Sequence, residues 1–316
     1  MNTPTVLVTG GCGFIGSHLV ENLLNQGYLV RVLDNLSTGK LSNLSKVSKE
    51  KLEIVVGSIT DFETVKNATQ NCTYILHQAA ITNVNQSIIE PISTSAVNYS
   101  GTINVLEAAR QCGVQRVIFA SSAAVYGDEP TLPKHEEMIT SPISPYGVDK
   151  LASELMGKAY TKISDVEFVS LRYFNVFGAR QTVNSSYAGV ISTFCNYVQN
   201  NISPVIYGDG MQSRDFIYVS DIVNANLLAM KLPLIKKEAV FNVGRGSAIT
   251  LLELIDILSQ LTQKDIRCIH KPARTGDIRY SVADVSRLQS FGWKAIVSVH
   301  EGLSLYLEYL QGNAVH

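Results

Sequence analysis

The chain has 316 residues and a formal net charge of −1, from 26 basic and 27 acidic side chains. This length is enough for two modest domains or one large domain with a full hydrophobic core. The balanced charge argues against nucleic acid or an anionic membrane as the partner. Because no apolar run reaches the length of a membrane span and the N-terminus lacks the basic and apolar regions of a signal peptide, we expect a cytoplasmic protein with no membrane or nucleic-acid partner.

A glycine-rich turn follows the first predicted strand, at residues 5–9, and a helix then leads to a second strand at residues 30–34. Gly10, Gly13 and Gly16 of this turn would let the backbone approach a diphosphate, and the start of the helix would offer it N–H groups and a positive dipole. The pattern predicts a dinucleotide site, with an ordinary structural turn as the alternative.

Asp34 ends the second strand and is followed by Asn35 rather than by an arginine. A carboxylate at this place accepts hydrogen bonds from the adenosine ribose and repels a 2′-phosphate. We therefore predict NAD, rather than NADP, as the cofactor. Asp34 could instead cap the turn formed by residues 35–39, and the two roles are compatible.

Strands and helices continue to alternate along the first half of the chain, which predicts an α/β fold with a doubly wound parallel sheet of the Rossmann type. We predict an NAD-binding domain over residues 1–171, completed by parts of 215–245, and a smaller C-terminal α/β substrate domain over 172–316. The further predicted strands are 52–56, 74–77, 117–121 and 168–172, and the further predicted helices are 92–112, 144–160, 220–232, 251–261 and 299–310.

Five cysteines are spread along the chain without a CxxC pair or a spacing to histidine that is typical of a metal site. We predict reduced, mostly buried thiols and no bound metal. The five are Cys12, Cys72, Cys112, Cys195 and Cys268.

Tyr146 and Lys150 are four residues apart, a spacing that places both side chains on one face of a helix. Ser144 and Pro145 suit the N-cap and first position of that helix. A phenol titrates at about pH 10, so a role as a base requires a lowered pKa, and a nearby lysine and the positive nicotinamide ring would act in that direction. Ser122 follows an apolar strand, where its hydroxyl could bond a substrate oxygen. We predict these three residues as catalytic; the alternatives are an exposed helix pair and a turn serine.

Seven motifs follow one another along the chain: Thr9-Gly-Gly-Cys-Gly-Phe-Ile-Gly16, His77-Gln-Ala-Ala80, Ser121-Ser-Ala-Ala-Val-Tyr-Gly127, Ser144-Pro-Tyr-Gly-Val-Asp-Lys150, Arg172-Tyr-Phe-Asn-Val-Phe-Gly178, Gly208-Asp-Gly-Met-Gln-Ser-Arg-Asp-Phe-Ile-Tyr-Val219 and Arg274-Thr-Gly-Asp277. In this order they resemble the motifs of the extended short-chain dehydrogenase/reductase family and, within it, of the UDP-hexose 4-epimerases, especially those acting on UDP-N-acetylglucosamine.

The resemblance implies that Tyr146 takes the proton of the sugar 4-hydroxyl while NAD⁺ accepts hydride from C4. A 4-keto sugar then turns over, and the hydride returns to its other face. Ser122 would steer the proton, and Lys150 would hold the nicotinamide ribose and lower the pKa of the tyrosine. The resemblance also implies a UDP-sugar substrate and a homodimer formed through the helices at about 92–112 and 145–161.

The resemblance places the cofactor on Gly10, Gly13, Phe14, Ile15, Gly16, Asp34, Asn35, Ser37, Thr38, Gly39, Ser58, Ile59, Gln78, Ala79, Ala80, Tyr146, Lys150 and Tyr173. It places the UDP-sugar on Thr82, Ser122, Tyr146, Asn175, Ala188, Gly189, Val190, Tyr207, Arg214, Arg274, Asp277 and Ser281. Of these, Arg214 and Arg274 would bind the diphosphate through their guanidinium groups.

Two positions bear on the reaction and the sugar. The family's 4,6-dehydratases have an acidic pair after the motif serine or threonine, whereas Ala123-Ala124 cannot act as acid or base. Ser281 stands where epimerases restricted to UDP-glucose and UDP-galactose carry a tyrosine, and a small residue leaves room for a 2-acetamido group. We predict C4 epimerisation of UDP-GlcNAc/UDP-GalNAc, with UDP-Glc/UDP-Gal left open as a second activity.

Departures from the family pattern and rival functions also follow from the sequence. Ser58 replaces an Asp that usually meets the adenine amino group, and Asn85-Gln86 stands where relatives place a basic residue near the sugar. The alternatives are another UDP-sugar enzyme on this scaffold (a decarboxylase, C5-epimerase or 4,6-dehydratase) or a catalytically silent NAD-binding regulator. A silent protein would be expected to lack at least one of the three predicted catalytic side chains, and all three are present.

Overall fold

The computed structural model describes residues 3–182, 189–233, 238–273 and 278–313. The chain divides into two compact units: the first consists of Met1–Glu129, Glu136–Tyr173 and Ile222–Asn242, and the second of Pro130–His135, Phe174–Asp221 and Val243–His316. Residues 130–135, which were predicted as part of the first domain, belong to the second unit. Their backbone pairs with a distant segment there, since Lys134 N–H donates to the Val282 carbonyl at 2.8 Å.

The first unit is built on seven strands, β1 (Thr5–Thr9), β2 (Leu29–Asp34), β3 (Leu52–Val56), β4 (Tyr74–His77), β5 (Arg116–Ser122), β6 (Glu167–Tyr173) and β11 (Glu238–Val243). Their order in the sheet is β11-β6-β5-β4-β1-β2-β3. The five pairs from β6 to β3 are all parallel. The chain adds strands first on one side of β1 and then on the other, so the predicted doubly wound α/β fold is confirmed.

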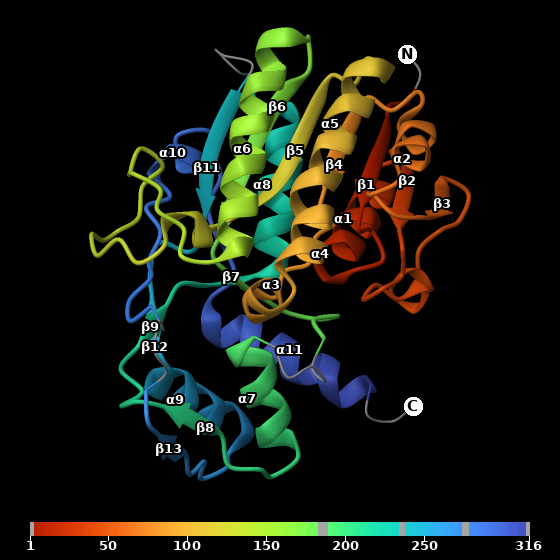
Figure 1. The fold of residues 1–316 in the computed structure, drawn as a ribbon. Helices are drawn as coiled ribbons and strands as arrows, with labels where there is room; N and C mark the ends of the chain where they lie inside the picture. The colour runs from red at the N-terminus through yellow and green to blue at the C-terminus, as the bar shows by residue number, and fades with distance from the viewer. Residues whose placement is uncertain (1–2, 183–188, 234–237, 274–277, 314–316) are drawn as a thin grey trace. The chain divides into compact units, whose positions relative to one another are not determined.

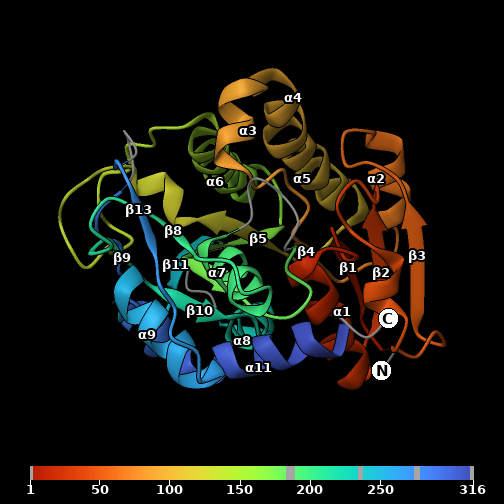
Figure 2. The same ribbon diagram turned by 90° about the horizontal axis from the view of Figure 1, so that it is seen from below.

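Helices cover both faces of this sheet, as Figures 1 and 2 show. One face carries α2 (Phe62–Thr69), α5 (Gly101–Cys112) and α6 (Pro145–Ile163), and the other carries α1 (Phe14–Asn25) and α8 (Val219–Lys231). The shorter helical elements of this unit are η1 (Leu41–Leu44), α3 (Val84–Ile89), α4 (Pro91–Ser95), η2 (Ala96–Ser100) and η3 (Ala123–Tyr126).

Burial on both faces explains why the central strands read as nearly continuous apolar runs. Leu7, Ile75, Val117 and Val169 have no exposed surface, whereas Val56 on the edge strand β3 is 62% exposed. Several of these strands also end in a polar residue, among them β1, β2 and β4. Because parallel strands have their carboxyl ends at the same edge of the sheet, these polar side chains gather along that edge.

Two predicted helices can be compared with the structure, and one of them differs from its prediction. α6 begins as predicted, because Pro145 occupies its first turn and the Ser144 hydroxyl accepts the N–H of Gly147 at 3.2 Å. The predicted helix 92–112 is helical throughout, but it is not a single α-helix. α4 passes into the π-helical segment η2 before α5 begins. A π-turn inserts an extra residue and is frequent near functional sites.

In its described residues the second unit has three small sheets instead of one large one. β7 (Asn175–Phe177) pairs with β10 (Phe216–Tyr218) and β8 (Val205–Tyr207) with β13 (Ile269–Lys271) in parallel, and β9 (Ser213–Arg214) pairs with β12 (Ile249–Thr250) in the antiparallel direction. Its helices are α7 (Val190–Gln199), α9 (Leu251–Thr262), α10 (Ser286–Gln289) and α11 (Val299–Asn313). None of these strands was predicted, because two or three residues are too few to display an alternating pattern.

The five cysteines are free thiols, as predicted. Across the described ranges, no helix combines the length and the apolar character that crossing a membrane requires.

Candidate active site

The glycine turn between β1 and α1 is packed so closely that its glycines have no room for a side chain. Gly10 has a φ of +69°, and a Cβ placed on it would lie 2.8 Å from the backbone nitrogen of Ala79; a Cβ on Gly16 would collide with the carbonyl oxygen of Gly10. Gly13 is the N-cap of α1 and provides no side-chain hydrogen bond, and the first turn, which includes Phe14 and Ile15, has no acidic residue. This helix start can receive a diphosphate, so it fits a dinucleotide.

Asp34 lies beside this turn with only 7% of its surface exposed. Its Oδ1 accepts the N–H of Leu36 at 2.8 Å, and its Oδ2 accepts the N–H of Cys12 at 2.9 Å. A Cβ on Gly39 would lie 2.9 Å from both carboxylate oxygens, so the turn packs directly on the carboxylate. The turn-capping role of Asp34 is therefore present, and it joins the end of β2 to the glycine turn.

The other proposed adenosine contacts lie on surface turns of the first unit. Asn35 Oδ1 accepts the N–H of Ser37 at 3.1 Å, and Thr38 is exposed beside them. After β3, the Ser58 hydroxyl bonds the Thr60 hydroxyl at 2.8 Å, and Ile59 is buried. Ser58 therefore organises a turn where an aspartate was expected from the family pattern.

Gln78, Ala79 and Ala80 follow β4, and Tyr173 is the last residue of β6. Asn226 of α8 joins the two strand ends: its Nδ2 donates to the Tyr173 hydroxyl at 2.7 Å, and its Oδ1 accepts from Gln78 Nε2 at 3.3 Å. Burial raises the pKa of Tyr173 to about 12, so this side chain remains a neutral phenol. These groups form a fixed polar row at the carboxyl edge of the sheet.

The structure brings Ser122 and Tyr146 together, although they are far apart in the chain. Ser122 ends β5, Tyr146 lies in the first turn of α6, and the Ser122 side chain lies close enough to the phenol to act on its pKa. The Ser122 hydroxyl also accepts the N–H of Ala124 at 3.1 Å, so the turn-serine role holds as well. Tyr146 is 8% exposed and its N–H donates to the Ser87 hydroxyl at 3.1 Å.

Lys150 lies one helical turn beyond Tyr146 and is 3% exposed. Its Nζ donates to the carbonyl oxygen of Ala120 at 2.7 Å and lies 4.7 Å from the ring centre of Phe119 and 5.8 Å from that of Tyr146. Burial lowers the pKa of Lys150 to about 8, against the opposing effects of Asp149 and Glu154. Serine, tyrosine and lysine thus gather at the end of β5.

The predicted lowering of the tyrosine pKa by the lysine is not what the structure provides. Burial raises the pKa of Tyr146, and the Ser122 side chain opposes this rise. The ammonium group of Lys150 is held by the Ala120 carbonyl instead of by the phenol oxygen. The predicted effect of the lysine is therefore wrong, because burial outweighs the effect of Ser122 and keeps Tyr146 a phenol; the predicted effect of the positive nicotinamide ring stays a prediction.

A buried ion pair braces the strand end behind these residues. Arg172 of β6 forms two hydrogen bonds with Glu154 of α6, at 2.9 and 2.7 Å, and both side chains are at most 6% exposed. Ser121 donates to the same carboxylate at 2.5 Å. The cluster ties β5 and β6 to α6. Removing one partner of such a pair would leave an uncompensated buried charge.

The second unit gathers several residues that were assigned to the UDP-sugar. Ser281 N–H donates to the Ser213 carbonyl at 3.2 Å, next to Arg214, whose Nη1 donates to the same carbonyl at 2.9 Å. Asn175 bonds the Asp215 carbonyl through its backbone N–H at 3.0 Å and its Nδ2 at 3.3 Å. Three predicted substrate residues therefore contact one short segment, residues 213–215.

The remaining predicted substrate residues are dispersed. Tyr207 ends β8, Gly189 is the N-cap of α7 and Val190 is its first residue. Thr82 is an exposed loop residue of the first unit. Ala188, Arg274 and Asp277 lie outside the described residues.

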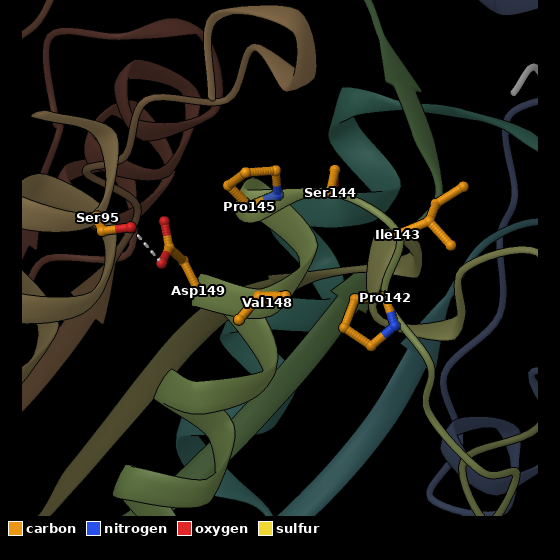
Figure 3. A pocket seen from close by; sticks show the side chains of 7 residues that line it. All are labelled: Ser95, Pro142, Ile143, Ser144, Pro145, Val148 and Asp149. Carbon is orange, nitrogen blue, oxygen red and sulfur yellow. Dashed lines mark hydrogen bonds between the residues drawn. The ribbon is translucent and has the colours of Figure 1, made fainter. Parts of the chain in front are cut away.

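Figure 3 shows a surface hollow of about 500 Å³ on the first unit. Two of its lining residues are hydrogen-bonded, since the Ser95 hydroxyl donates to Asp149 Oδ1 at 2.8 Å. Neither Tyr146 nor Lys150 lines it, so it is not the predicted active site. Its lining residues are Ser95, Pro142, Ile143, Ser144, Pro145, Val148 and Asp149.

Sequence reasoning missed three buried polar residues near the predicted ones. Asn98 holds the loop after β4 by accepting from Ile81 N–H at 2.8 Å and donating to its carbonyl at 2.9 Å. Asn226 joins Tyr173 and Gln78. Asp215 is fully buried and accepts the backbone N–H groups of residues 245, 246 and 283. A polar residue inside an apolar stretch, as at Asn98 and Asn226, was the available signal.

The parallel α/β sheet, the glycine turn with Asp34, and the cluster of Ser122, Tyr146 and Lys150 define a nucleotide-binding protein of the extended short-chain dehydrogenase/reductase class. A model of the NAD dependent epimerase/dehydratase family matches residues 6–244, and the chain belongs to this family. The predicted class and the predicted cofactor, NAD, are confirmed.

Similarity to known proteins extends over the whole length. The chain is 37% identical to a putative UDP-glucose 4-epimerase of Methanocaldococcus jannaschii, over 98% of this chain and 99% of that one. Among solved structures, it resembles a UDP-N-acetylglucosamine 4-epimerase of Methanobrevibacter ruminantium, in complex with UDP-N-acetylmuramic acid (TM-score 0.94, 38% identity, 99% of this chain and 100% of that one). It also resembles a UDP-glucose 4-epimerase of Thermotoga maritima with UDP-glucose (TM-score 0.93, 36% identity, 98% and 99%).

Proposed function

We propose that this protein is a UDP-sugar 4-epimerase that interconverts UDP-GlcNAc and UDP-GalNAc. The observation that carries the proposal is the placement of Ser122 at the end of β5 beside Tyr146 in the first turn of α6, with the buried Lys150 one turn further along α6. A hydroxyl pair of this kind can hold and move the proton of a sugar hydroxyl. Relatives with both UDP-glucose and UDP-N-acetylglucosamine in their names support the coarser activity.

Once a bound positive group has lowered its pKa and its own proton has left, Tyr146 as the phenolate takes the proton of the 4-hydroxyl and later returns it, while the Ser122 hydroxyl polarises the sugar oxygen at C4. When bound, NAD supplies reversible hydride transfer at C4. Lys150, which is held at the Ala120 carbonyl, carries a positive charge below pH of about 8 and offers N–H donors to a ribose. Burial of Tyr146 and Lys150 excludes water from the groups that exchange the proton.

The second unit supplies the groups that we propose to hold UDP. Arg214 bonds the Ser213 carbonyl and Asn175 bonds the Asp215 carbonyl, so the segment 213–215 brings a guanidinium and an amide group near one another. A guanidinium forms paired hydrogen bonds with phosphate oxygens. Arg274 and Asp277, outside the described residues, remain proposed contacts by family resemblance.

Two small side chains support the proposed substrate and reaction. Ser281, half-buried beside Ser213, has the size to admit a 2-acetamido group where a tyrosine would fill the space. Ala123 and Ala124, which follow Ser122 in η3, have no acid or base for dehydration.

The substrate proposal is tested by measuring C4 epimerisation of UDP-GlcNAc and UDP-Glc with the wild-type protein and with Ser281→Tyr. We expect the substitution to remove the UDP-GlcNAc activity and to spare any UDP-Glc activity. The matched control is Ser290→Tyr, an exposed serine of the same unit whose hydroxyl only donates to the Arg287 carbonyl. An unchanged UDP-GlcNAc rate in Ser281→Tyr would contradict the size argument.

The absorbance of reduced nicotinamide distinguishes an epimerase from a catalytically silent NAD-binding protein. On adding UDP-sugar to the NAD-loaded protein, an enzyme shows transient reduced nicotinamide at about 340 nm, because C4 oxidation precedes re-reduction. No absorbance change together with no epimerised product would reject the enzymatic proposal.

We also propose a homodimer formed through α4–α5 and α6. Ile92 at the start of this surface is 87% exposed and Leu155 of α6 is 61% exposed, which is costly for apolar side chains in a monomer. Sedimentation velocity should show a dimer in the wild type and a monomer in Ile92→Glu/Leu155→Glu. A dimer that persists in the double variant would show that another surface is used.

A further inference from the structure

A line of buried polar groups connects the segment after β4 with helix α5, and the proposed reaction does not use it. His77, the last residue of β4, is 1% exposed and lies beside Thr9 in the parallel pair of β1 and β4. Its Nδ1 is 2.7 Å from the Thr9 hydroxyl, and its Nε2 is 3.0 Å from the Thr102 hydroxyl of α5. A buried imidazole with a short contact at each nitrogen has a defined hydrogen-bonding state.

That state follows from counting protons. The Thr102 hydroxyl donates its only hydrogen to the Asn98 carbonyl at 2.6 Å, so it can only accept from His77 Nε2. Nε2 therefore carries a hydrogen. In a neutral ring Nδ1 is then an acceptor and receives the hydrogen of the Thr9 hydroxyl. The Thr9 oxygen in turn accepts the N–H of Ala79 at 3.2 Å.

The hydrogen bonds thus run in one direction, from the Ala79 N–H through Thr9, His77 and Thr102 to the Asn98 carbonyl. Every donor in this line has one acceptor. The far end returns to the same loop, because the Asn98 amide group binds both the N–H and the carbonyl of Ile81, at 2.8 and 2.9 Å. The backbone from Ala79 to Ile81 is therefore held at both ends.

This backbone segment is part of the cofactor surface. Ala79 lies directly against Gly10 of the glycine turn, where a Cβ would come within 2.8 Å of its nitrogen. The catalytic helix joins the same line, because the hydroxyl of Ser153 in α6 donates to the Asn98 carbonyl at 3.3 Å. Asn98 itself lies in the π-helical segment η2.

We infer that His77, in its neutral Nε2–H form, is a positioning residue that holds residues 79–81 against the glycine turn and keeps this part of the NAD surface in register with α6. The inference deepens the proposed function, and it rests on that function only for its kinetic readout, since NAD binding belongs to the family as a whole.

The charge environment agrees with this role. Burial and, secondly, the positive charge of Lys150 lower the pKa of His77 to about 3, so the ring stays neutral at physiological pH. The ring of Phe119 stands next to both groups, 5.7 Å from the His77 ring and 4.7 Å from the Lys150 ammonium. A charged His77 ring would be repelled by the Lys150 ammonium. It would also carry a hydrogen on Nδ1, which could then no longer accept the hydrogen of the Thr9 hydroxyl.

The first test is the protonation state itself. Nitrogen-15 NMR of the wild-type protein at pH 7, with imidazole nitrogens labelled, should show His77 with a hydrogen on Nε2 and none on Nδ1. This measurement needs no variant and no substrate. A charged ring, or a ring with its hydrogen on Nδ1, would overturn the inference.

The second test uses NAD retention in three variants of the full chain. His77→Leu removes both hydrogen bonds, whereas His77→Asn can still accept from Thr9. Thr69→Val is the control, since Thr69 is an equally buried hydroxyl of the same unit that donates only within α2, to the Val65 carbonyl at 2.8 Å. We expect NAD to dissociate about tenfold faster from His77→Leu, less from His77→Asn, and at the wild-type rate from Thr69→Val.

Amide hydrogen exchange separates positioning from general destabilisation. In His77→Leu the amides of Ala79 and Ile81 should exchange faster, while those of β5 change no more than in the Thr69→Val control. NAD retention within twofold of the control, or a uniform rise in exchange, would show a merely structural role.

The experiments distinguish an error in the proposed epimerase function from an error in the positioning role of His77. If the wild type does not epimerise UDP-sugars but His77→Leu loses NAD, the proposed function falls and the positioning role stands. If the wild type epimerises and His77→Leu matches the control in NAD retention and in kcat, the positioning role falls and the function stands.

Discussion

The two units position functional groups in different ways. In the first unit, Tyr146 and Lys150 are 8% and 3% exposed and stand at the edge of a continuous parallel sheet. In the second unit, Arg214 and Tyr207 lie on strands of two and three residues and are half-buried. The first unit holds its groups by burial, and the second holds them by a few backbone hydrogen bonds.

This difference matches the two kinds of work that we propose. Proton transfer depends on pKa values and on hydrogen-bond direction, which burial and fixed partners control. Recognition of a nucleotide sugar depends on the placement of donors and on the size of a pocket, which short strands and loops can supply. Substitutions in the first unit should therefore change chemistry or folding strongly, and those in the second should change substrate binding.

The largest effect is expected for Tyr146→Phe. The phenyl ring keeps the buried volume but loses the hydroxyl that exchanges the proton, so turnover should fall by about a thousandfold. Because the phenyl ring keeps the packing of this buried side chain, the bound NAD content should be unchanged. Product analysis by NMR and absorbance of released NAD measure the two quantities. Turnover near the wild-type rate would reject the catalytic assignment.

The next effect concerns Lys150 and pH. Its pKa is about 8 in the folded protein and 10.5 ordinarily, so between these values the unfolded chain binds more protons and the free energy of unfolding rises with pH. At about 1.4 kcal/mol per pKa unit, this gain is ~3 kcal/mol between pH 8 and 10.5. The Lys150→Met variant should lack this gain in the free energy of unfolding, because it has no ammonium group at this position. Urea unfolding of both proteins across this range gives the difference, and a pH-independent difference would show that the buried ammonium has an ordinary pKa.

Gly16→Ala should have a somewhat smaller effect, located at the glycine turn. The added methyl group meets the carbonyl of Gly10, and overpacking of this kind costs roughly 1–3 kcal/mol. We expect a lower unfolding free energy and a lower NAD content. Gly312→Ala is the control in the second unit, because a Cβ there meets nothing within 4 Å. Equal NAD content in the two variants would contradict the close approach of NAD to the turn.

The smallest effect is expected for Arg214→Ala in the second unit. Loss of one guanidinium contact to a phosphate should raise KM about tenfold with little change in kcat, if the contact is equally strong throughout the reaction. Arg279→Ala is the control, since this side chain is 57% exposed and pairs with Asp209. Steady-state kinetics with the UDP-sugar distinguishes them. A fall in kcat at unchanged KM would place Arg214 in the chemical step.

The sequence by itself was sufficient for the features that depend on neighbours in the chain. The glycine turn with Asp34, the four-residue spacing of Tyr146 and Lys150, and the apolar strands at 5–9, 52–56 and 74–77 all appeared where predicted. Local spacing determines these features, because helix and strand periods and glycine conformations are set by adjacent residues.

Only the tertiary structure decided the features that depend on burial and on distant partners. Gln78 and Asn226 bond across 148 residues, and His77 and Thr102 across 25. The raised pKa of Tyr146 and the attachment of Lys150 to the Ala120 carbonyl likewise follow from packing. A pKa and a hydrogen-bond direction are properties of the whole surroundings of a group, and these surroundings exist only once the sheet and its helices have assembled.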